Sequence, residues 1–314
     1  MPASLVNVIL GPAKSGKTEH ALARYGDFLA HWLADLTQPP GVWIGPTLSA
    51  INDVRDRLAL AGEGALLAPR TTTFARLAEE IIAQGQRRIR PIGQLEKLRI
   101  LTQLIRQLVA ENQLRHFTAV ALSPGFTRQV AEAIADLKRR DVWAEDFRER
   151  VRDDRERDFA QIYSAYQQHL HAHALYDAEG RFWAAREELE KISSPTRKRG
   201  EFRFGLIVLD GFADFTTAQH DLLRLLTAHS DELLITLPAD HAEISPRELL
   251  FDKPMRTLEI LEKSFPQLRR EDASEVGLHQ RVHHDPARSR QREAPHPDRP
   301  ERRLEADVDQ HRVH

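Results

Sequence analysis

The chain opens with a short apolar run, a glycine-containing segment and then apolar residues at helical spacing. Residues 5–10, "LVNVIL", have the composition of a buried strand, and residues 19–36 repeat apolar side chains every three or four positions. Small and polar residues fill positions 11–18 between them. A second strand pattern follows at 41–47, and a second helical pattern at 48–60. We therefore predict that the chain begins with alternating strands and helices.

The centre of the chain shows helical periodicity only. Residues 71–83 are predicted to form a helix that threonines cap at its start. Long amphipathic segments without strand signals then run from about residue 94 to residue 190. A polar, basic and proline-containing loop at 193–201 ends this region. We predict that it forms a helical domain.

The α/β pattern resumes after residue 203. Residues 204–210 and 231–238 are predicted strands, and residues 217–229 and 254–265 are predicted helices. The predicted architecture is a parallel α/β core that is interrupted by an all-helical insertion. Its predicted parts are the first section of the core at 1–90, the insertion at 91–192, the second section of the core at 193–270 and a tail at 271–314.

The tail differs in composition from the rest of the chain. From Gly277 onward it contains many arginines, histidines and prolines but no lysine and no aromatic residue. Its apolar residues are too sparse to bury a face, so we predict disorder. The abrupt change also favours an out-of-frame end to a longer gene, which the neighbouring DNA would test. The histidines have no fixed ligand spacing, so we expect no specific metal site.

The composition adds limits on the class of protein. The 314 residues are 41% hydrophobic and 29% charged, which allows a real core. The formal net charge is −2, so a DNA-binding surface would have to be a local patch. The absence of cysteine excludes disulfides and thiolate metal sites and fits a reducing cytoplasm. We find no signal peptide and no membrane-length apolar run, so we expect a cytoplasmic protein without membrane contact.

The strongest motif is "GPAKSGKT", which matches the phosphate-binding pattern G-x-x-x-x-G-K-[ST]. Its glycines let backbone N–H groups converge on phosphate oxygens, and the next helix directs its positive end toward them. Lys17 would reach the β- and γ-phosphates, and the Thr18 hydroxyl would bind Mg²⁺. ATP and Mg²⁺ are therefore the expected cofactors. The predicted binding residues are Gly11, Pro12, Ala13, Lys14, Ser15, Gly16, Lys17 and Thr18.

Asp210 is the predicted second residue of the metal site. It ends an apolar strand, where a carboxylate can reach Mg²⁺ through a water molecule; an ordinary strand-ending aspartate is the alternative. Gly211 stands where many such ATPases hold a catalytic glutamate. Losing that carboxylate removes a factor of ~10²–10⁴ in rate, so we expect ATP binding with weak or no hydrolysis. Glutamate at position 211 is expected to raise turnover if the rest of the site is intact.

Several segments together resemble the N-terminal motor region of UvrD-like superfamily 1 helicases, and in particular the B subunit of AddAB-type helicase–nucleases. "DGFADFT" (210–216) is similar to a metal-site segment that reads roughly D-E-F-Q-D-T-N. "IGPTLSAINDVRDRL" resembles a strand and helix that touch single-stranded DNA, and "TTTFARLAEEII" resembles the segment that follows it. The matching residues are Asp210, Phe212, Asp214, Gln219, Pro46, Thr47, Ala50, Thr73, Phe74 and Ala78.

The resemblance runs from about residue 5 to residue 265 and implies a RecA-like P-loop fold. It also implies ATP, Mg²⁺, single-stranded or duplex DNA and an AddA-type partner subunit in double-strand break repair. Thr47 and Phe74 would lie near single-stranded DNA, although core packing is an equal reading of Phe74. The chain is then expected to be an N-terminal or truncated portion of such a subunit.

The departures from the family pattern point to a degenerate motor. Gly211 replaces the glutamate, and the strand at 231–238 is not followed by the G-D-x-x-Q-S-I-Y pattern. We find no second motor domain and no nuclease motif. Two alternatives stay open. The first is a stand-alone P-loop ATPase or kinase, for which basic clusters at 138–141 and 197–200 are the candidate lids; the second is a non-enzymatic scaffold or decayed gene product.

Overall fold

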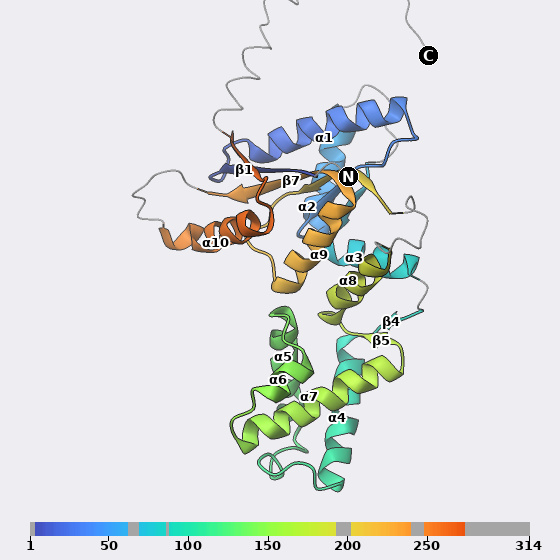
Figure 1. The fold of residues 1–314 in the computed structure, drawn as a ribbon, viewed down its shortest axis with the longest axis vertical. Coiled ribbons are helices and arrows are strands. Elements are labelled where there is room, and N and C mark those ends of the chain that lie inside the picture. Colours follow the sequence, from blue (N-terminus) through green and yellow to red (C-terminus); the bar gives the residue numbers. More distant parts are fainter. Residues whose placement is uncertain (1–3, 62–68, 86–87, 193–201, 240–247, 274–314) are drawn as a thin grey trace, which may run out of the picture.

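The computed structural model describes residues 4–61, 69–85, 88–192, 202–239 and 248–273. These residues form a sheet with helices on both faces and a separate helical part that projects from it (Figure 1). The basic loop at 193–201 lies outside the described residues. So does the tail, apart from its first three residues at 271–273.

Six strands of the described chain form one sheet, and all of their pairings are parallel. The predicted α/β class with a parallel sheet is thereby confirmed. In spatial order the strands are β3 (Thr71–Thr73), β2 (Val42–Gly45), β6 (Phe204–Leu209), β7 (Ser230–Pro238), β1 (Leu5–Gly11) and β8 (Arg269–Asp272). Because the strands are parallel, their carboxyl ends share one edge of the sheet.

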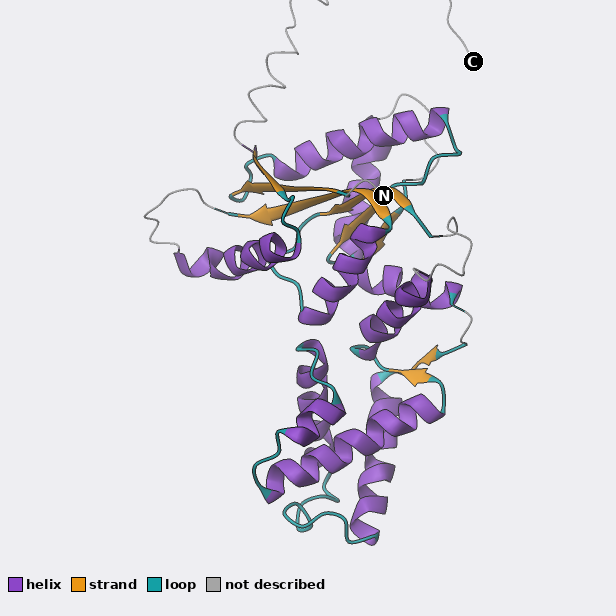
Figure 2. Ribbon diagram, in the orientation of Figure 1, coloured by secondary structure: helices purple, strands orange, loops and turns teal. Residues whose placement is uncertain are grey.

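Both faces of the sheet are covered, which explains why its strands β2, β6 and β7 are largely apolar on both sides. In β6, Leu206 and Val208 face one layer of helices, and Ile207 and Leu209 face the other. The first layer consists of α1 (Lys17–Ala34) and α2 (Leu48–Ala61). The second layer contains α3 (Phe74–Gln84), α8 (Gly180–Ile192), α9 (Thr217–Ala228) and α10 (Glu248–Ser264). Figure 2 shows the strands between these helices.

The helical part has a core of its own. It contains α4 (Gln94–Ala110), α5 (Pro124–Arg139), α6 (Ala144–Glu149) and α7 (Asp154–Ala172), packed around one cluster of buried apolar side chains. The chain enters through β4 (Arg90–Pro91) and leaves through β5 (Leu175–Tyr176), which pair in parallel as a neck (Figure 1). The prediction of no strand between residues 94 and 190 was therefore wrong, because two residues are too few to show a strand period.

Other predicted boundaries also change. Residues 71–73 were predicted as the start of a helix, but they form β3, because they pair with β2. Thr73 is nevertheless the cap, since its hydroxyl accepts a hydrogen bond from the Arg76 N–H at 3.3 Å. Helix α6 and strand β8 were not predicted; β8 is charged and lies at the sheet edge. Helix α8 packs on α3 and α9, so it lies against the sheet layer.

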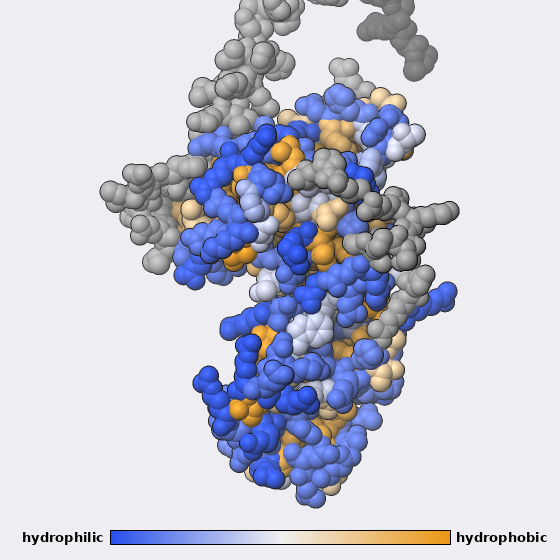
Figure 3. Space-filling model, in the orientation of Figure 1, coloured by the Kyte–Doolittle hydropathy of each residue, from blue (hydrophilic) through white to orange (hydrophobic). Residues whose placement is uncertain are grey.

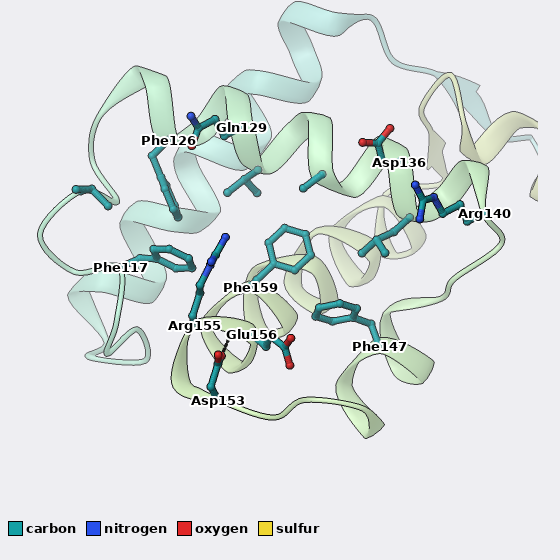
Figure 4. Close-up of a pocket in the computed structure, with 14 residues that line it drawn as sticks. Phe117, Phe126, Gln129, Asp136, Arg140, Phe147, Asp153, Arg155, Glu156 and Phe159 are labelled. Atoms are coloured by element: carbon teal, nitrogen blue, oxygen red, sulfur yellow. Dashed lines mark hydrogen bonds between the residues drawn. The ribbon is translucent and has the colours of Figure 1, made fainter.

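The face seen in Figure 3 is largely hydrophilic on both parts, with scattered apolar residues. The insertion contains a hollow of about 660 Å³. Phe117, Phe126, Phe147 and Phe159 line it, and charged side chains surround them (Figure 4). None of the helices in the described ranges has the length and apolar character needed to cross a bilayer.

A buried charge cluster joins the insertion to α8 just after the neck. Asp177, 1% exposed, accepts from the Lys138 ammonium at 2.7 Å and pairs with Lys97 at 3.3 Å. It also accepts from the Tyr166 hydroxyl at 3.1 Å and from the Gly180 N–H at 2.8 Å. One carboxylate thus ties α4, α5 and α7 to the first residue of α8.

The electrostatics of this cluster follow from burial and charge. Burial by itself would raise the pKa of Asp177, but Lys138, Lys97 and the hydrogen bonds together lower it to about 2. Folding therefore lowers this pKa from 3.8 to about 2. The carboxylate stabilises the fold fully above pH ~4, and this contribution is lost as the pH falls toward 2.

Asp177→Asn is expected to lower the free energy of unfolding by about 3–5 kcal/mol, because Lys138 would remain buried without its counter-charge. Urea unfolding at pH 7 measures this change. The control is Asp252→Asn, which removes an exposed pair with Arg256 on α10 and is expected to cost under about 1 kcal/mol. Equal losses in the free energy of unfolding for the two substitutions would show that the Asp177 cluster does not stabilise the junction at the β4–β5 pair.

Candidate nucleotide-binding site

The candidate site begins where β1 ends. Gly11 is the last residue of β1 and Lys17 the first residue of α1, so the motif forms the connection between them. Two positions in this connection are left-handed, with φ of 66° at Lys14 and 90° at Gly16. A Cβ atom on Gly11 would lie 2.3 Å from the Ser15 Oγ, so this position requires glycine. The predicted strand, loop and helix are therefore present.

The structure brings Thr18 and Asp210 together across 192 positions of sequence. The Thr18 hydroxyl, in the first turn of α1, donates to Asp210 Oδ1 at 3.0 Å and to Oδ2 at 3.3 Å. Asp210 directly follows β6 and is 9% exposed. A hydroxyl and a carboxylate at this spacing are the oxygen ligands that Mg²⁺ accepts, directly or through water.

Lys17 and Ser15 supply two further polar groups to the loop. The Lys17 ammonium donates to the Pro12 carbonyl at 2.9 Å. Partial burial lowers the pKa of Lys17, and the negative charge of Asp210 opposes that shift. The Ser15 Oγ is buried and has no hydrogen-bond partner among the described residues. A buried hydroxyl without a partner is unfavourable unless a bound group satisfies it.

Gly211 has a structural reason to be glycine. Its φ is +82°, which side-chain-bearing residues rarely adopt, and an added Cβ would lie 3.3 Å from Pro46 Cδ. Its N–H donates to the Thr236 hydroxyl at 3.4 Å. The backbone turns sharply directly after Asp210, and a glutamate at this position would be strained.

Two other residues of the same segment have structural partners. Asp214, the first carboxylate after Asp210 in the sequence, is 57% exposed and lies 3.7 Å from the Lys253 ammonium of α10. Gln219 forms a capping box with Thr216 at the start of α9. Neither contact joins these residues to Asp210.

The two predicted DNA-binding residues lie in different environments. Thr47 is exposed at the carboxyl end of β2, where its hydroxyl accepts from the Ala50 N–H at 3.2 Å and caps α2. Phe74 is 3% exposed, and its ring centroid lies 5.8 to 6.2 Å from those of Phe182, Phe212 and Phe215. The burial of Phe74 agrees with a role in core packing, because a base cannot stack on a buried ring.

Thr236 is a second side chain that contacts Asp210, and it was not predicted from the sequence. Its hydroxyl donates to Asp210 Oδ1 at 2.5 Å, and the side chain is fully buried. The available signal was a lone hydroxyl within the apolar strand "LLITLP". In a strand that is buried on both faces, a polar side chain needs a partner.

A family model described as "ADDB, N-terminal" matches residues 8–293. The chain belongs to the AddB N-terminal family. The match covers the whole candidate loop and Asp210, and it also extends to residue 293 in the predicted tail.

Curated relatives bear one consistent name, which describes the B subunit of an ATP-dependent helicase/deoxyribonuclease. The one from Pelotomaculum thermopropionicum is 26% identical over 245 residues, which are 76% of this chain and 21% of the relative. The one from Caldanaerobacter subterraneus subsp. tengcongensis is 23% identical over 261 residues, 78% of this chain and 21% of the relative. The one from Moorella thermoacetica is 25% identical over 261 residues, 78% of this chain and 22% of the relative. The AddB-type match thus spans about a fifth of each relative.

Gly211→Glu and Gly211→Ala are each expected to lower the free energy of unfolding by about 1–2 kcal/mol, because both place a Cβ on a left-handed backbone. Chemical denaturation measures the change. Gly26→Ala is the matched control: no atom lies within 4 Å of a Cβ built there in α1, so it is expected to stabilise by about 0.5–1 kcal/mol.

The strain at position 211 replaces the simple expectation that glutamate there raises turnover. A strained backbone would not hold the carboxylate in a fixed place, so phosphate release by Gly211→Glu is expected to stay at the level of the unchanged chain. Raised release without loss of stability would contradict the strain argument.

Proposed function

We propose that the chain is the helicase-like N-terminal portion of the B subunit of an ATP-dependent helicase/deoxyribonuclease, and that it binds Mg·ATP and acts on DNA in double-strand break repair. The observation that carries this proposal is the contact between Thr18 and Asp210 at the mouth of the Gly11–Thr18 loop. The family match and the names of the relatives support the DNA-repair context.

The residues of the loop fit a magnesium nucleotide. Ser15 has a buried hydroxyl without a protein partner among the described residues, and Lys17 supplies a positive charge to the same loop. Gly16 has no atom within 4 Å of a Cβ built on it, which leaves open space at the start of α1. In this proposal Lys17 and the loop amides bind phosphate oxygens, and Thr18 and Asp210 hold the metal ion.

Bound Mg·ATP would supply a phosphoanhydride bond. The free energy of nucleotide binding can shift a protein between conformations. We propose binding with little hydrolysis. Position 211 offers no carboxylate, and the nearby Asp214 faces Lys253. A water molecule at the γ-phosphate would then lack a base or orienting group, a loss of ~10²–10⁴ in rate.

A RecA-like fold of the UvrD type is part of the same proposal. The parallel sheet, with a helical insertion between β3 and β6, supports it. Thr47 lies at the carboxyl edge of the sheet, beside the segment that carries Gly211, and is proposed to lie near single-stranded DNA. The relatives' name, which designates one subunit of an enzyme, supports a second subunit, which we propose to be of the AddA type.

The alternative of a stand-alone ATPase or kinase needs a basic lid. In the candidate cluster at 138–141, two of the basic side chains are already paired: Lys138 is buried on Asp177, and Arg139 pairs with Asp136 and Glu179. The second cluster, 197–200, lies outside the described residues. The observations therefore favour the helicase-like reading over this alternative.

Lys17→Ala is expected to weaken the binding of a fluorescent ATP analogue roughly ten- to a hundred-fold, the loss typical of a hydrogen bond to a charged group. The titration is made with Mg²⁺, with and without a single-stranded oligonucleotide, and phosphate release is recorded in parallel. We expect tight binding and negligible release from the unchanged chain, with nucleotide affinity altered by the oligonucleotide.

The matched control is Lys263→Ala, an exposed lysine in the last turn of α10, which is expected to bind the analogue normally. No binding by the unchanged chain would support the decayed scaffold instead. Robust release that is independent of DNA would move the assignment to the stand-alone ATPase.

A further inference from the structure

Thr236 is a buried hydroxyl at a point where three segments meet. It lies on β7, which is between β6 and β1 in the sheet. In the strand register Ile9 of β1 pairs with Thr236, and Leu209 of β6 pairs with Ile235. Thr236 is thus level with Asp210 on one side and with Ile9, two residues before the nucleotide loop, on the other.

The side-chain period of the strands places the relevant groups on one face. Leu206 and Val208 of β6 and Leu234 of β7 face the layer that contains α1. Two residues further along each strand, Asp210 and Thr236 point to the same face. Thr18, in the first turn of α1, reaches Asp210 from that layer.

The hydrogen bonds at Thr236 give its hydroxyl one orientation. Its proton goes to Asp210 Oδ1 at 2.5 Å, and its oxygen accepts from the Gly211 N–H at 3.4 Å. Asp210 Oδ1 therefore receives two hydroxyls, from Thr236 and from Thr18 at 3.0 Å. The second oxygen, Oδ2, has the longer Thr18 contact of 3.3 Å and is the less engaged one.

We infer that Thr236 is a positioning residue for the metal-binding carboxylate: it fixes Asp210 by Oδ1 and leaves Oδ2 directed toward the ion. The inference rests on the proposed binding of Mg·ATP at this site. Thr18 also donates to Asp210, but its hydroxyl oxygen is itself the proposed metal ligand, so Thr236 is the partner of Asp210 that has no proposed contact with the ion. Thr236 is fully buried on a central strand and keeps the carboxylate oriented whether or not the ion is bound.

The expected consequence is specific to the metal. Without the Thr236 hydroxyl, Asp210 loses a hydrogen bond to a charged group and can rotate away from the ion. The Gly211 N–H also loses its acceptor, so the turn that sets the carboxylate is less well fixed. Contacts between the loop and the phosphates do not involve Thr236 and are expected to remain.

The test measures the dissociation constant of a fluorescent ATP analogue for the whole chain, once with Mg²⁺ and once with EDTA. Thr236→Val keeps the shape of the side chain and removes the hydroxyl. We expect the gain in affinity from Mg²⁺ to fall roughly ten-fold or more, the loss typical of a hydrogen bond to a charged group, with affinity in EDTA unchanged.

A pair of further variants separates the effect of the hydroxyl from the effect of side-chain packing. Thr236→Ser and Thr236→Ala both lose the methyl group and differ only by the hydroxyl, so serine is expected to retain the Mg²⁺ gain and alanine to lose it. Thermal unfolding identifies any variant that does not fold; the serine and alanine pair then replaces valine.

A Mg²⁺ gain that is the same in all folded variants overturns the inference, even if they unfold at lower temperature. Failure of the unchanged chain to bind the analogue contradicts the proposed function instead. The two failures are therefore distinguishable.

Discussion

The structure depends on the requirement that a central parallel strand must pair along both sides. Strand β7 satisfies it by lying between β1 and β6, two strands that are nearly 200 positions apart in the sequence. Because parallel strands end at a common edge, these two pairings bring the Gly11–Thr18 loop and Asp210 together. The hydroxyl of Thr236 then has a position from which it reaches the carboxylate. The strand order brings the residues of the site together, and side-chain hydrogen bonds then orient the Asp210 carboxylate.

The helical insertion meets a different constraint. The chain must leave the second helix layer after α3 and return to it at α8, so both connections have to lie close together. The short pairing of β4 with β5 achieves this, and Asp177 fixes the two ends by binding lysines from α4 and α5. Buried charges of this kind are costly unless each one is matched. The cluster meets that condition, because the carboxylate is surrounded by two ammonium groups, a phenol and a backbone N–H.

The sequence was most informative where periodicity and motif coincide. The strands at 5–10, 41–47, 204–210 and 231–238 and the loop between β1 and α1 were predicted correctly, because buried parallel strands give continuous apolar runs. Strands β3, β4, β5 and β8 were missed: they are short, and their assignment comes from pairing. The burial of Phe74 was not decidable from sequence, since an aromatic residue at the start of a helix serves packing or stacking equally well. Thr236 was missed for a related reason, because one hydroxyl in an apolar strand has a meaning only when the strand order is known.

The segment after Asp210 is also connected to the insertion through Phe74 and the aromatic residues of α8. Phe212 and Phe215 belong to the aromatic cluster with Phe182 of α8, and both are 9% exposed. The next residue of α8, Trp183, stacks on Trp143 of the insertion with ring centroids 4.0 Å apart. Close-packed side chains of this kind leave little free volume, so a displacement of one has to be taken up by its neighbours. A change in the turn at Gly211 therefore also affects the aromatic cluster around Phe74, because Phe212 and Phe215 follow that turn directly.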